Sequence, residues 1–262
     1  MIIDWIYNNP TWLWGSILVA LFTGAACGGL MIVHRLVHVS VRKAHNDLAG
    51  FTIAVIGVLY AVLLAFIAIA TWEAFSNASM IVENESGFAG GIYLDTLGLP
   101  QAKGQVIRDA VARYVSVVIN DEWPLQRQGK VPSQGWKPLR EIDRAIVDIQ
   151  PQNLGEAVLQ AELLKTWNEL YQARNSRLSA VEGHIPRVVW WIAFLGASIT
   201  TGYSYFFGYQ SFGMHLAMTG TLAATLAMVL VLIIALDWPF RGEISVSPDS
   251  FITIQRSWSQ VR

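Results

Sequence analysis

The chain alternates between long runs without charge and one long polar segment. A helix needs roughly 20 mainly apolar residues to cross the hydrocarbon core of a bilayer. Four charge-free runs meet that length: Thr11–Val33, Leu48–Trp72, Val188–Phe207 and Leu216–Leu236. The pattern predicts an all-α integral membrane protein with four transmembrane helices, arranged as a first pair within residues 1–72 and a second pair within residues 188–236.

The segment between the pairs, residues 73–187, is predicted to be a helical extramembrane domain. It holds 12 of the 18 Lys and Arg residues and 14 of the 19 Asp and Glu residues. The second span continues without a helix breaker as far as Gly87, so its helix should project well beyond the bilayer. Pro100 marks the start of the next helix, which should run to about Glu122. Residues 237–262 form a C-terminal tail.

The end of the polar segment carries an apolar stripe at helical spacing. Its members recur at intervals of three, four and seven residues: Leu164, Trp167, Tyr171, Leu178 and Val181. Such a stripe is typical of a helix that faces a core or a subunit interface. We expect this helix to run straight into the third span, as one continuous rod.

Composition and charge exclude several classes of function. Of the residues, 53% are hydrophobic and 14% charged, and the formal net charge is -1. Nucleic acid is therefore not an expected partner, because phosphate binding needs clustered positive charge. Cys27 is the only cysteine, so no disulfide framework or redox pair is possible. The chain lacks GxSxG, HExxH and Walker A motifs, and we expect neither enzymatic activity nor a cofactor.

The first link between spans is the basic one. It carries Arg35, Arg42 and Lys43, whereas the N-terminal tail has no Lys or Arg and the C-terminal tail has Arg241 close to the last span. The positive-inside rule counts such short links and discounts long domains. It favours a multi-pass membrane protein with this link in the cytoplasm and the polar domain on the opposite side of the membrane.

Three histidines in the first link are candidate metal or haem ligands. If the helix continues through the link, offsets of four and seven place His34, His38 and His45 on one face, where imidazoles can share a metal ion. Imidazole rings also suit the headgroup boundary, beside Arg35 and Arg42. That second interpretation is favoured, and no metal site is predicted.

Two acidic groups lie outside the spans. Glu73, Glu83 and Glu85 follow the second span, and in several copies around an axis they would form carboxylate rings that attract cations at a pore mouth. A solvated helix face is the favoured interpretation for any single one of them, and Glu73 is the best pore-mouth candidate because it follows the membrane edge directly. Asp121 and Glu122 precede Trp123 near a helix C-terminus, where acidic residues oppose the helix dipole. A structural salt bridge to Arg residues is the favoured interpretation there.

The second span also offers a candidate pore face. Its members lie on roughly one side of the helix and combine one polar ring with an apolar constriction: Thr52, Ile56, Tyr60, Leu63 and Ile67. The spans contain no charged residue, which argues against a pump, because pumps mark their pathways with ionisable groups. A pore-forming homo-oligomer that conducts inorganic ions across the lipid bilayer is the preferred hypothesis. The alternative is a non-conducting interaction or sensory protein whose polar domain binds a partner.

Four motifs stand in order along the chain: HNDLAGF (His45–Phe51), LYAVLLAFIAIATWE (Leu59–Glu73), YVSVVINDEWP (Tyr114–Pro124) and LDWPFRG (Leu236–Gly242). Together they resemble the bestrophin-like family of bacterial membrane proteins, a family named for distant similarity to bestrophin channels. The resemblance implies a bacterial inner membrane, and with the charges of the first link the polar domain is then expected in the periplasm. The residues that carry the resemblance are His45, Asn46, Asp47, Trp72, Asp121, Glu122, Trp123, Pro239, Phe240 and Gly242.

The resemblance implies a four-span architecture with a helical domain between spans two and three. Bestrophins proper are pentameric channels whose second span lines the pore, but this chain lacks their neck motif, so only the arrangement carries over. Glu85 is followed here by Ser86, where the family often has Ala. Bestrophins keep their extramembrane domain in the cytoplasm, opposite to the side that the local charges favour.

Overall fold

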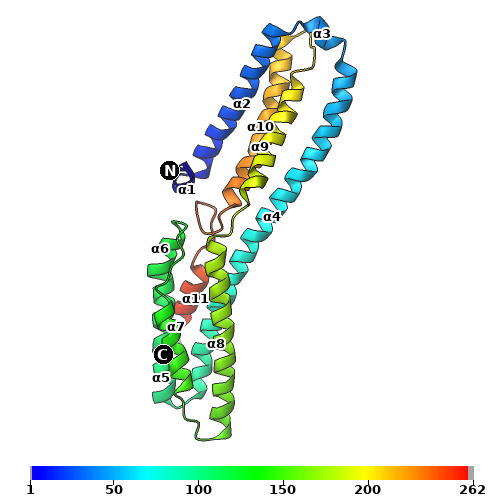
Figure 1. Cartoon of the computed structure of the whole chain (residues 1–262). Coiled ribbons are helices and arrows are strands. Elements are labelled where there is room, and N and C mark those ends of the chain that lie inside the picture. The colour runs from blue at the N-terminus through cyan, green and yellow to red at the C-terminus, as the bar shows by residue number, and fades with distance from the viewer. Residues whose placement is uncertain (1, 259–262) are drawn as a thin grey trace. The chain divides into compact units, whose positions relative to one another are not determined.

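A computed structural model describes residues 2–258, and within them every regular element is helical. The elements are α1 (Ile2–Asn8), α2 (Thr11–Leu36), α3 (Val39–Lys43), α4 (Asn46–Asp95), η1 (Thr96–Gly98), α5 (Gln101–Val117), η2 (Val118–Glu122), α6 (Trp123–Gln126), α7 (Trp136–Val147), α8 (Leu154–Val181), α9 (Arg187–Ser204), α10 (Phe212–Leu236) and α11 (Asp249–Trp258) (Figure 1). The predicted all-α fold is therefore confirmed.

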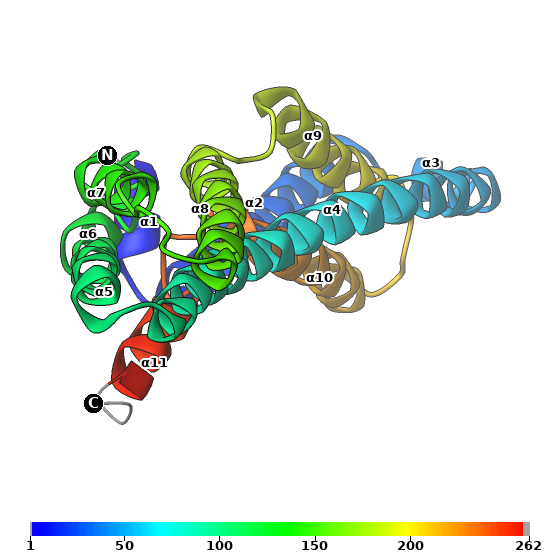
Figure 2. The same ribbon diagram turned by 90° about the horizontal axis from the view of Figure 1, so that it is seen from below.

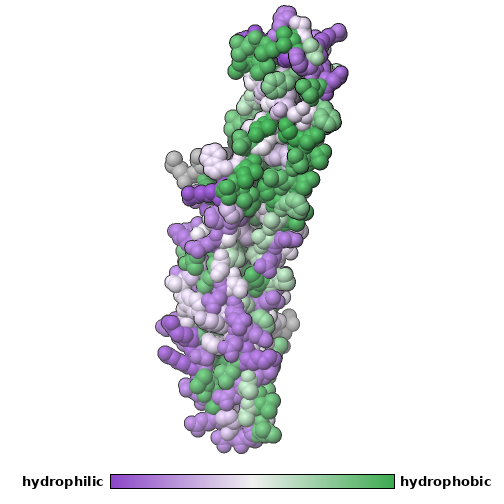
Figure 3. All heavy atoms as spheres, turned by 45° about the vertical axis from the view of Figure 1, so that its right-hand side comes forward, coloured by the Kyte–Doolittle hydropathy of each residue, from purple (hydrophilic) through white to green (hydrophobic). Residues whose placement is uncertain are grey.

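The chain divides into two compact units. The membrane unit comprises Met1–Glu73, His184–Asp237 and Gly242–Ile244. The polar unit comprises Ala74–Gly183, Trp238–Arg241 and Ser245–Arg262. Figure 3 shows hydrophobic side chains gathered over the membrane-spanning helices and hydrophilic ones over most of the polar unit.

Within the described residues, three helices are long and apolar enough to cross a membrane, namely α2, α4 and α10. The fourth expected span is α9, a helix of 18 residues that falls short of the other three by those criteria. It nevertheless belongs to the same bundle, because Ala193 and Ala197 on α9 are fully buried against Tyr60 and Leu64 of α4. Among residues 2–258, α9 is thus the least apolar member of the expected set of spans.

The first link does not continue α2. Val37 and His38 adopt extended backbone conformations, and the short helix α3 follows before α4 begins. The link is instead fastened to the α9–α10 loop: Arg42 donates from Nη1 to the carbonyls of Tyr205 and Phe207 at 3.3 and 3.4 Å. Asn46 exchanges two hydrogen bonds with the backbone of Gly208, at 3.2 and 2.8 Å.

In the polar unit, other helices pack around the second part of α4. Figure 2 shows α8 and α11 on different sides of it. Gly91 lies against Thr166 of α8, and Gly90 lies against Ile254 of α11. The predicted continuation of the second span as one helix past Gly87 is confirmed, since α4 runs without interruption to Asp95.

The predicted continuity of the last polar helix with the third span is wrong. Helix α8 ends at Val181, and α9 starts only at Arg187. Gly183 follows the end of α8, and Pro186 disfavours helical geometry at the residue before it. The stripe expected on α8 is also partly displaced: Leu178 and Val181 are buried, whereas Tyr171 is exposed and Leu164 and Trp167 are half-buried.

Candidate functional site

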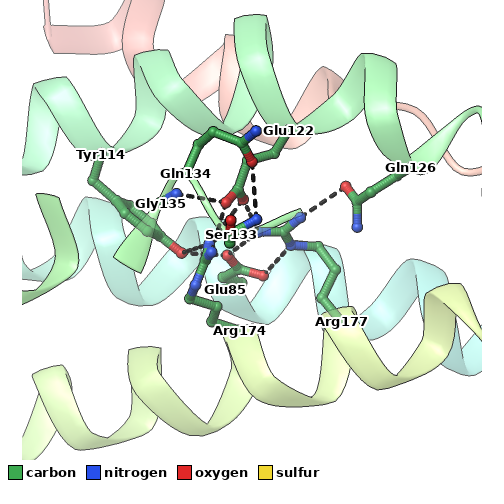
Figure 4. Close-up of polar contacts among 9 residues, drawn as sticks. All are labelled: Glu85, Tyr114, Glu122, Gln126, Ser133, Gln134, Gly135, Arg174 and Arg177. Atoms are coloured by element: carbon green, nitrogen blue, oxygen red, sulfur yellow. Dashed lines mark hydrogen bonds and ion pairs between the residues drawn. The ribbon is translucent and has the colours of Figure 1, made fainter. Parts of the chain in front are cut away.

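The polar unit encloses a cluster of charged side chains in its core. Glu85 comes from α4, Glu122 from the π-helical turn η2, and Arg174 and Arg177 from α8. All four are fully buried, at 0% exposure. Two positive and two negative groups balance, so the set is formally neutral. With Tyr114, Gln126 and the loop before α7, these residues form what we call the buried charge network (Figure 4).

Arg177 is the centre of the buried charge network. Its Nε donates to Oε2 of Glu85 at 2.6 Å, and its Nη2 donates to Oε1 of the same carboxylate at 3.0 Å. The same Nη2 reaches Oε2 of Glu122 at 3.0 Å, while Nη1 donates to the amide oxygen of Gln126 at 2.7 Å. The face of Trp123 lies 5.7 Å from this guanidinium. One side chain of α8 thereby joins α4, η2 and α6.

Arg174 forms a bidentate pair with Glu122. Its Nη1 and Nη2 donate to the two carboxylate oxygens at 2.8 and 2.6 Å, the fork geometry that guanidinium and carboxylate favour. The ring of Trp136 lies 4.8 Å from the guanidinium. Oε1 of Glu122 also accepts the backbone N–H of Gly135 at 2.6 Å. Glu122 therefore fastens the start of α7 to α8.

Gly135 is required at this point because its neighbours leave no room. A Cβ atom there would lie 2.5 Å from Nη1 of Arg174 and 2.7 Å from Oε1 of Glu122. Carbon atoms do not approach polar atoms so closely, so any side chain at this position would push the bidentate pair apart.

The protonation states follow from burial and from the partners. Burial alone would raise the pKa of Glu122, but the hydrogen bonds from Arg174 and the charge of Arg177 outweigh it and hold the pKa below 4.5. Burial, and then the charge of Glu85, raises the pKa of Tyr114, so its hydroxyl stays protonated and donates to Glu85. Burial would lower the pKa of Arg177, yet the charge of Glu85 raises it overall.

The buried charge network acts as a clamp between helices. Its ionised groups are enclosed by protein and directed at one another, and the elements they join are α4, η2, α6, α8 and the start of α7. Breaking one such pair leaves a charge in a medium of low dielectric, which is costly. The network therefore fixes how α4 sits within the polar unit.

The candidate pore residues lie on the buried side of α4. Tyr60 is only 7% exposed, and its hydroxyl donates to the carbonyl of Ala193 on α9 at 2.6 Å. Leu63 and Ile67 are partly buried and pack against the same cluster. Thr52 donates to Leu48, four residues back on its own helix, and Ile56 is half-buried. Tyr60, Leu63 and Ile67 thus pack within a single copy of the chain, and a pore-lining role for this face stays a prediction.

The opposite side of α4 is exposed in the part of the chain that the structure describes. Its exposed members recur every three or four residues: Phe51, Val55, Val58, Val62, Phe66 and Ile69. We call this set the outer face of α4. At 100° per residue, Val62 points almost directly away from Tyr60. The sequence alone did not show which face of α4 is buried and which is exposed, because both are apolar.

The structure separates the three glutamates of α4. Glu73 and Glu83 are exposed, whereas Glu85 is fully buried and paired with Arg177. Glu85 therefore cannot present its carboxylate to an aqueous axis, which corrects its place among the pore-mouth candidates. Glu73 and Glu83 keep that role as a proposal.

The two acidic residues before Trp123 differ in burial: Glu122 is buried and Asp121 is exposed. The favoured salt bridge is present, since Glu122 pairs with both Arg174 and Arg177. Trp123 is buried and meets the edge of Phe240 at 5.8 Å between ring centroids, so two of the family-like motifs lie together in the polar unit.

Of the other motif residues, Gly242 and Pro239 lie in the turns that follow α10, and two more lie on α4. Gly242 has φ of +89°, a backbone conformation that favours glycine. Pro239 accepts the backbone N–H of Val246 at 2.8 Å. Asp47 and Trp72 are exposed on α4.

The three histidines of the first link are not brought onto one face. His34 lies near the end of α2, where its Nδ1 faces Nη2 of Arg42 at 2.9 Å, and His45 bonds from Nδ1 to the carbonyl of Val41 at 2.9 Å. His38 is exposed at the start of α3. Within residues 2–258, no group of three or more His, Cys, Asp or Glu side chains could hold a metal ion.

Sequence reasoning missed the two arginines of the buried charge network. Their signal is positional: buried residues of α8 recur at 163, 166, 170, 174, 177 and 181, so Arg174 and Arg177 occupy an otherwise largely apolar stripe. Charged residues in such a stripe are almost never fully buried unless they are paired. That observation could have predicted buried partners for them.

A family model for the Bestrophin-like domain matches residues 20–251. The chain belongs to the bestrophin-like family. The resemblance carried by its four motifs is thereby confirmed. The sequence matches none of the curated proteins.

Solved crystal structures share the bestrophin-like fold. One, described as a membrane protein, is 15% identical with a TM-score of 0.67, over 95% of this chain and 97% of that chain. A variant of a bacterial bestrophin homologue from Klebsiella pneumoniae is 14% identical with a TM-score of 0.67, over 91% and 98%. A second variant of that homologue is 15% identical with a TM-score of 0.63, over 95% of this chain and 97% of that chain. At these identities the likeness establishes the fold alone.

Proposed function

We propose that this bestrophin-like protein is an ion channel formed by several copies of the chain, with α4 lining the pore. Membership of the bestrophin-like family supports an ion channel as the class of protein. The observation that carries the proposal is the outer face of α4, a long apolar strip that nothing covers in the single chain of the membrane unit. In a ring of copies such a strip would narrow an aqueous path to an apolar constriction, of the kind that gates by dewetting.

The polar unit supplies the second support. There the exposed side of α4 changes character and carries Glu83 and Asn84, while Glu73 stands at the end of the membrane unit. Repeated around an axis, these carboxylates would attract cations to the pore mouth. The buried charge network holds this polar-unit part of α4 in place through the bonds from Arg177 to Glu85.

Single-channel recording after reconstitution tests the proposal. Val62→Ala removes bulk from the outer face and should raise the conductance, because a wider apolar neck dewets less readily. Leu64→Ala is the matched control, since Leu64 is buried on the other side of α4; it should lower stability without raising conductance. Silent bilayers together with a monomer in mild detergent would overturn the proposal and favour a non-conducting interaction or sensory protein.

A separate measurement tests the acidic mouth. Glu83→Gln removes an exposed carboxylate without changing its shape, so the ratio of cation to anion permeability should fall. Glu162→Gln is the control, because Glu162 is an exposed carboxylate on α8 paired with Lys165. Equal permeability ratios in the wild type and in Glu83→Gln would exclude Glu83 from the ion path.

We further propose that the protein resides in the bacterial inner membrane with the basic first link in the cytoplasm. The support is the charge of that link, which carries Arg35, Arg42 and Lys43.

A further inference from the structure

A groove of about 620 Å³ opens between α2 and α10 in the membrane unit. Small side chains leave this space empty, among them Ser16 and Ala20 of α2 and Ala224 of α10. The two helices approach closely at Gly15: a Cβ atom added there would lie 3.0 Å from Cγ1 of Val231. Both helices are apolar enough to span a membrane, so the groove faces hydrocarbon.

One end of the groove lies at the level of the lipid headgroups. The backbone N–H of Thr11 donates there to the Glu243 carboxylate at 2.8 Å, and an ionised carboxylate belongs in the polar layer. Trp12, which also lines the groove, is 69% exposed, as an interfacial tryptophan should be.

The length of the groove corresponds to one leaflet. Its lining on α2 extends from Thr11 to Thr23, which is roughly 18 Å at 1.5 Å per helical residue. Half of the ~30 Å hydrocarbon core is about 15 Å. A groove that starts at the headgroups and ends near the bilayer midplane has the extent of a single acyl chain.

Water does not suit this space, because an ordered water needs two to four polar partners and the lining is mostly apolar. We infer that the groove binds one acyl chain of a bilayer phospholipid, with its headgroup end beside Thr11 and Trp12. The chain restores the dispersion contacts that the small side chains forgo. The site is separate from the proposed pore face on α4 and does not depend on conduction.

Photo-crosslinking of the full-length protein tests the inference. The protein is reconstituted in phosphatidylethanolamine vesicles that contain a photoactivatable acyl chain, and mass spectrometry locates the adducts. We expect adducts on groove residues of α2 and α10. Ala20→Leu fills the groove and should reduce them several-fold. Ala25→Leu is the matched control, because Ala25 is exposed on α2 but does not line the groove; its adducts should stay at the wild-type level.

Two results would overturn the inference. One is equal labelling of the groove in Ala20→Leu and Ala25→Leu, which would mean non-specific lipid contact. The other is an absence of groove adducts in the wild type, combined with loss of subunit association in Ala20→Leu alone. That outcome would show that a second copy of the chain occupies the groove.

Discussion

At the scale of single residues, the polar unit is organised by charge as much as by apolar packing. Arg174 and Arg177 are among the largest fully buried side chains of the described residues. A buried ion pair gains little over a hydrophobic substitute, because desolvation offsets the attraction. Removing one partner lowers the stability strongly, since the remaining charge stays buried without a partner. The pairs therefore specify one arrangement of helices more than they add stability.

Removing Arg177 should be costly. Arg177→Met leaves Glu85 buried without its bidentate partner, and we expect the free energy of unfolding to fall by roughly 3–5 kcal/mol. Arg113→Met is the control, because Arg113 pairs with Glu141 at an exposed position, with side-chain exposures of 56% and 34%; it should cost under about 1 kcal/mol. Denaturant unfolding in detergent measures both. Equal effects would contradict a clamp at Arg177.

Acid should weaken the same network. The folded pKa of Glu122 lies below 4.5, because the bonds from Arg174 and the charge of Arg177 outweigh burial. A lowered folded pKa gives stability that is present above the unfolded pKa and is lost as pH falls through the folded value. The Tm should therefore decline below about pH 4.5. Asp121→Asn should retain this decline, whereas Glu122→Gln should show a lower Tm at pH 7 and a flatter acid limb. Parallel curves for the wild type and Glu122→Gln would contradict the assignment.

Only part of the buried charge network could be predicted from the sequence. The favoured salt bridge for Glu122 rested on its opposition to the helix dipole, and that local argument was sufficient. The identity of its partners was not predictable, because Arg174 and Arg177 lie more than 50 positions away along the chain. Glu83 and Glu85 look alike in sequence. Only the rotation of α4 puts one in solvent and the other in the core.

At the scale of elements, helix existence was predictable and helix orientation was not. The span on α4 is apolar on nearly every side, so hydrophobic periodicity does not reveal which face packs inward. Large side chains such as Tyr60 made a pore face plausible, yet Tyr60 reaches α9 instead. The break between α8 and α9 carried a visible signal at Gly183 and Pro186. An apolar stripe on both sides of that break suggested continuity that the backbone does not have.

The contact between α4 and α9 depends on one glycine. A Cβ atom at Gly196 would collide with the ring of Tyr60. Gly196→Ala should lower the free energy of unfolding by about 1–3 kcal/mol, as expected for overpacking. Gly202→Ala is the control on the same helix, because nothing lies within 4 Å of an added Cβ there; it should be neutral or slightly stabilising. Thermal unfolding compares them, and a stabilised Gly196→Ala variant would contradict the packing.

At the scale of the whole molecule, the exposed apolar surface requires covering. Most of each spanning segment of α2 and α4 is unburied within one copy of the chain. Lipid can cover such surfaces on any membrane protein, and neighbouring copies can cover them in a ring. The proposals assign the two faces differently: the outer face of α4 to a pore axis, and the groove between α2 and α10 to lipid.

The side of the membrane is a prediction about the whole molecule. By the positive-inside rule, the three basic residues of the first link predict that this link lies in the cytoplasm and the polar unit in the periplasm. The test uses single cysteines in a Cys27→Ser background: Gln128→Cys in an exposed loop of the polar unit, and Ser40→Cys in the exposed first link. A membrane-impermeant maleimide applied to cells with a permeabilised outer membrane should label Gln128→Cys at once and Ser40→Cys only after lysis. The reverse pattern would place the polar unit in the cytoplasm, as in bestrophins proper, and would mean that the charge of the link does not set the topology.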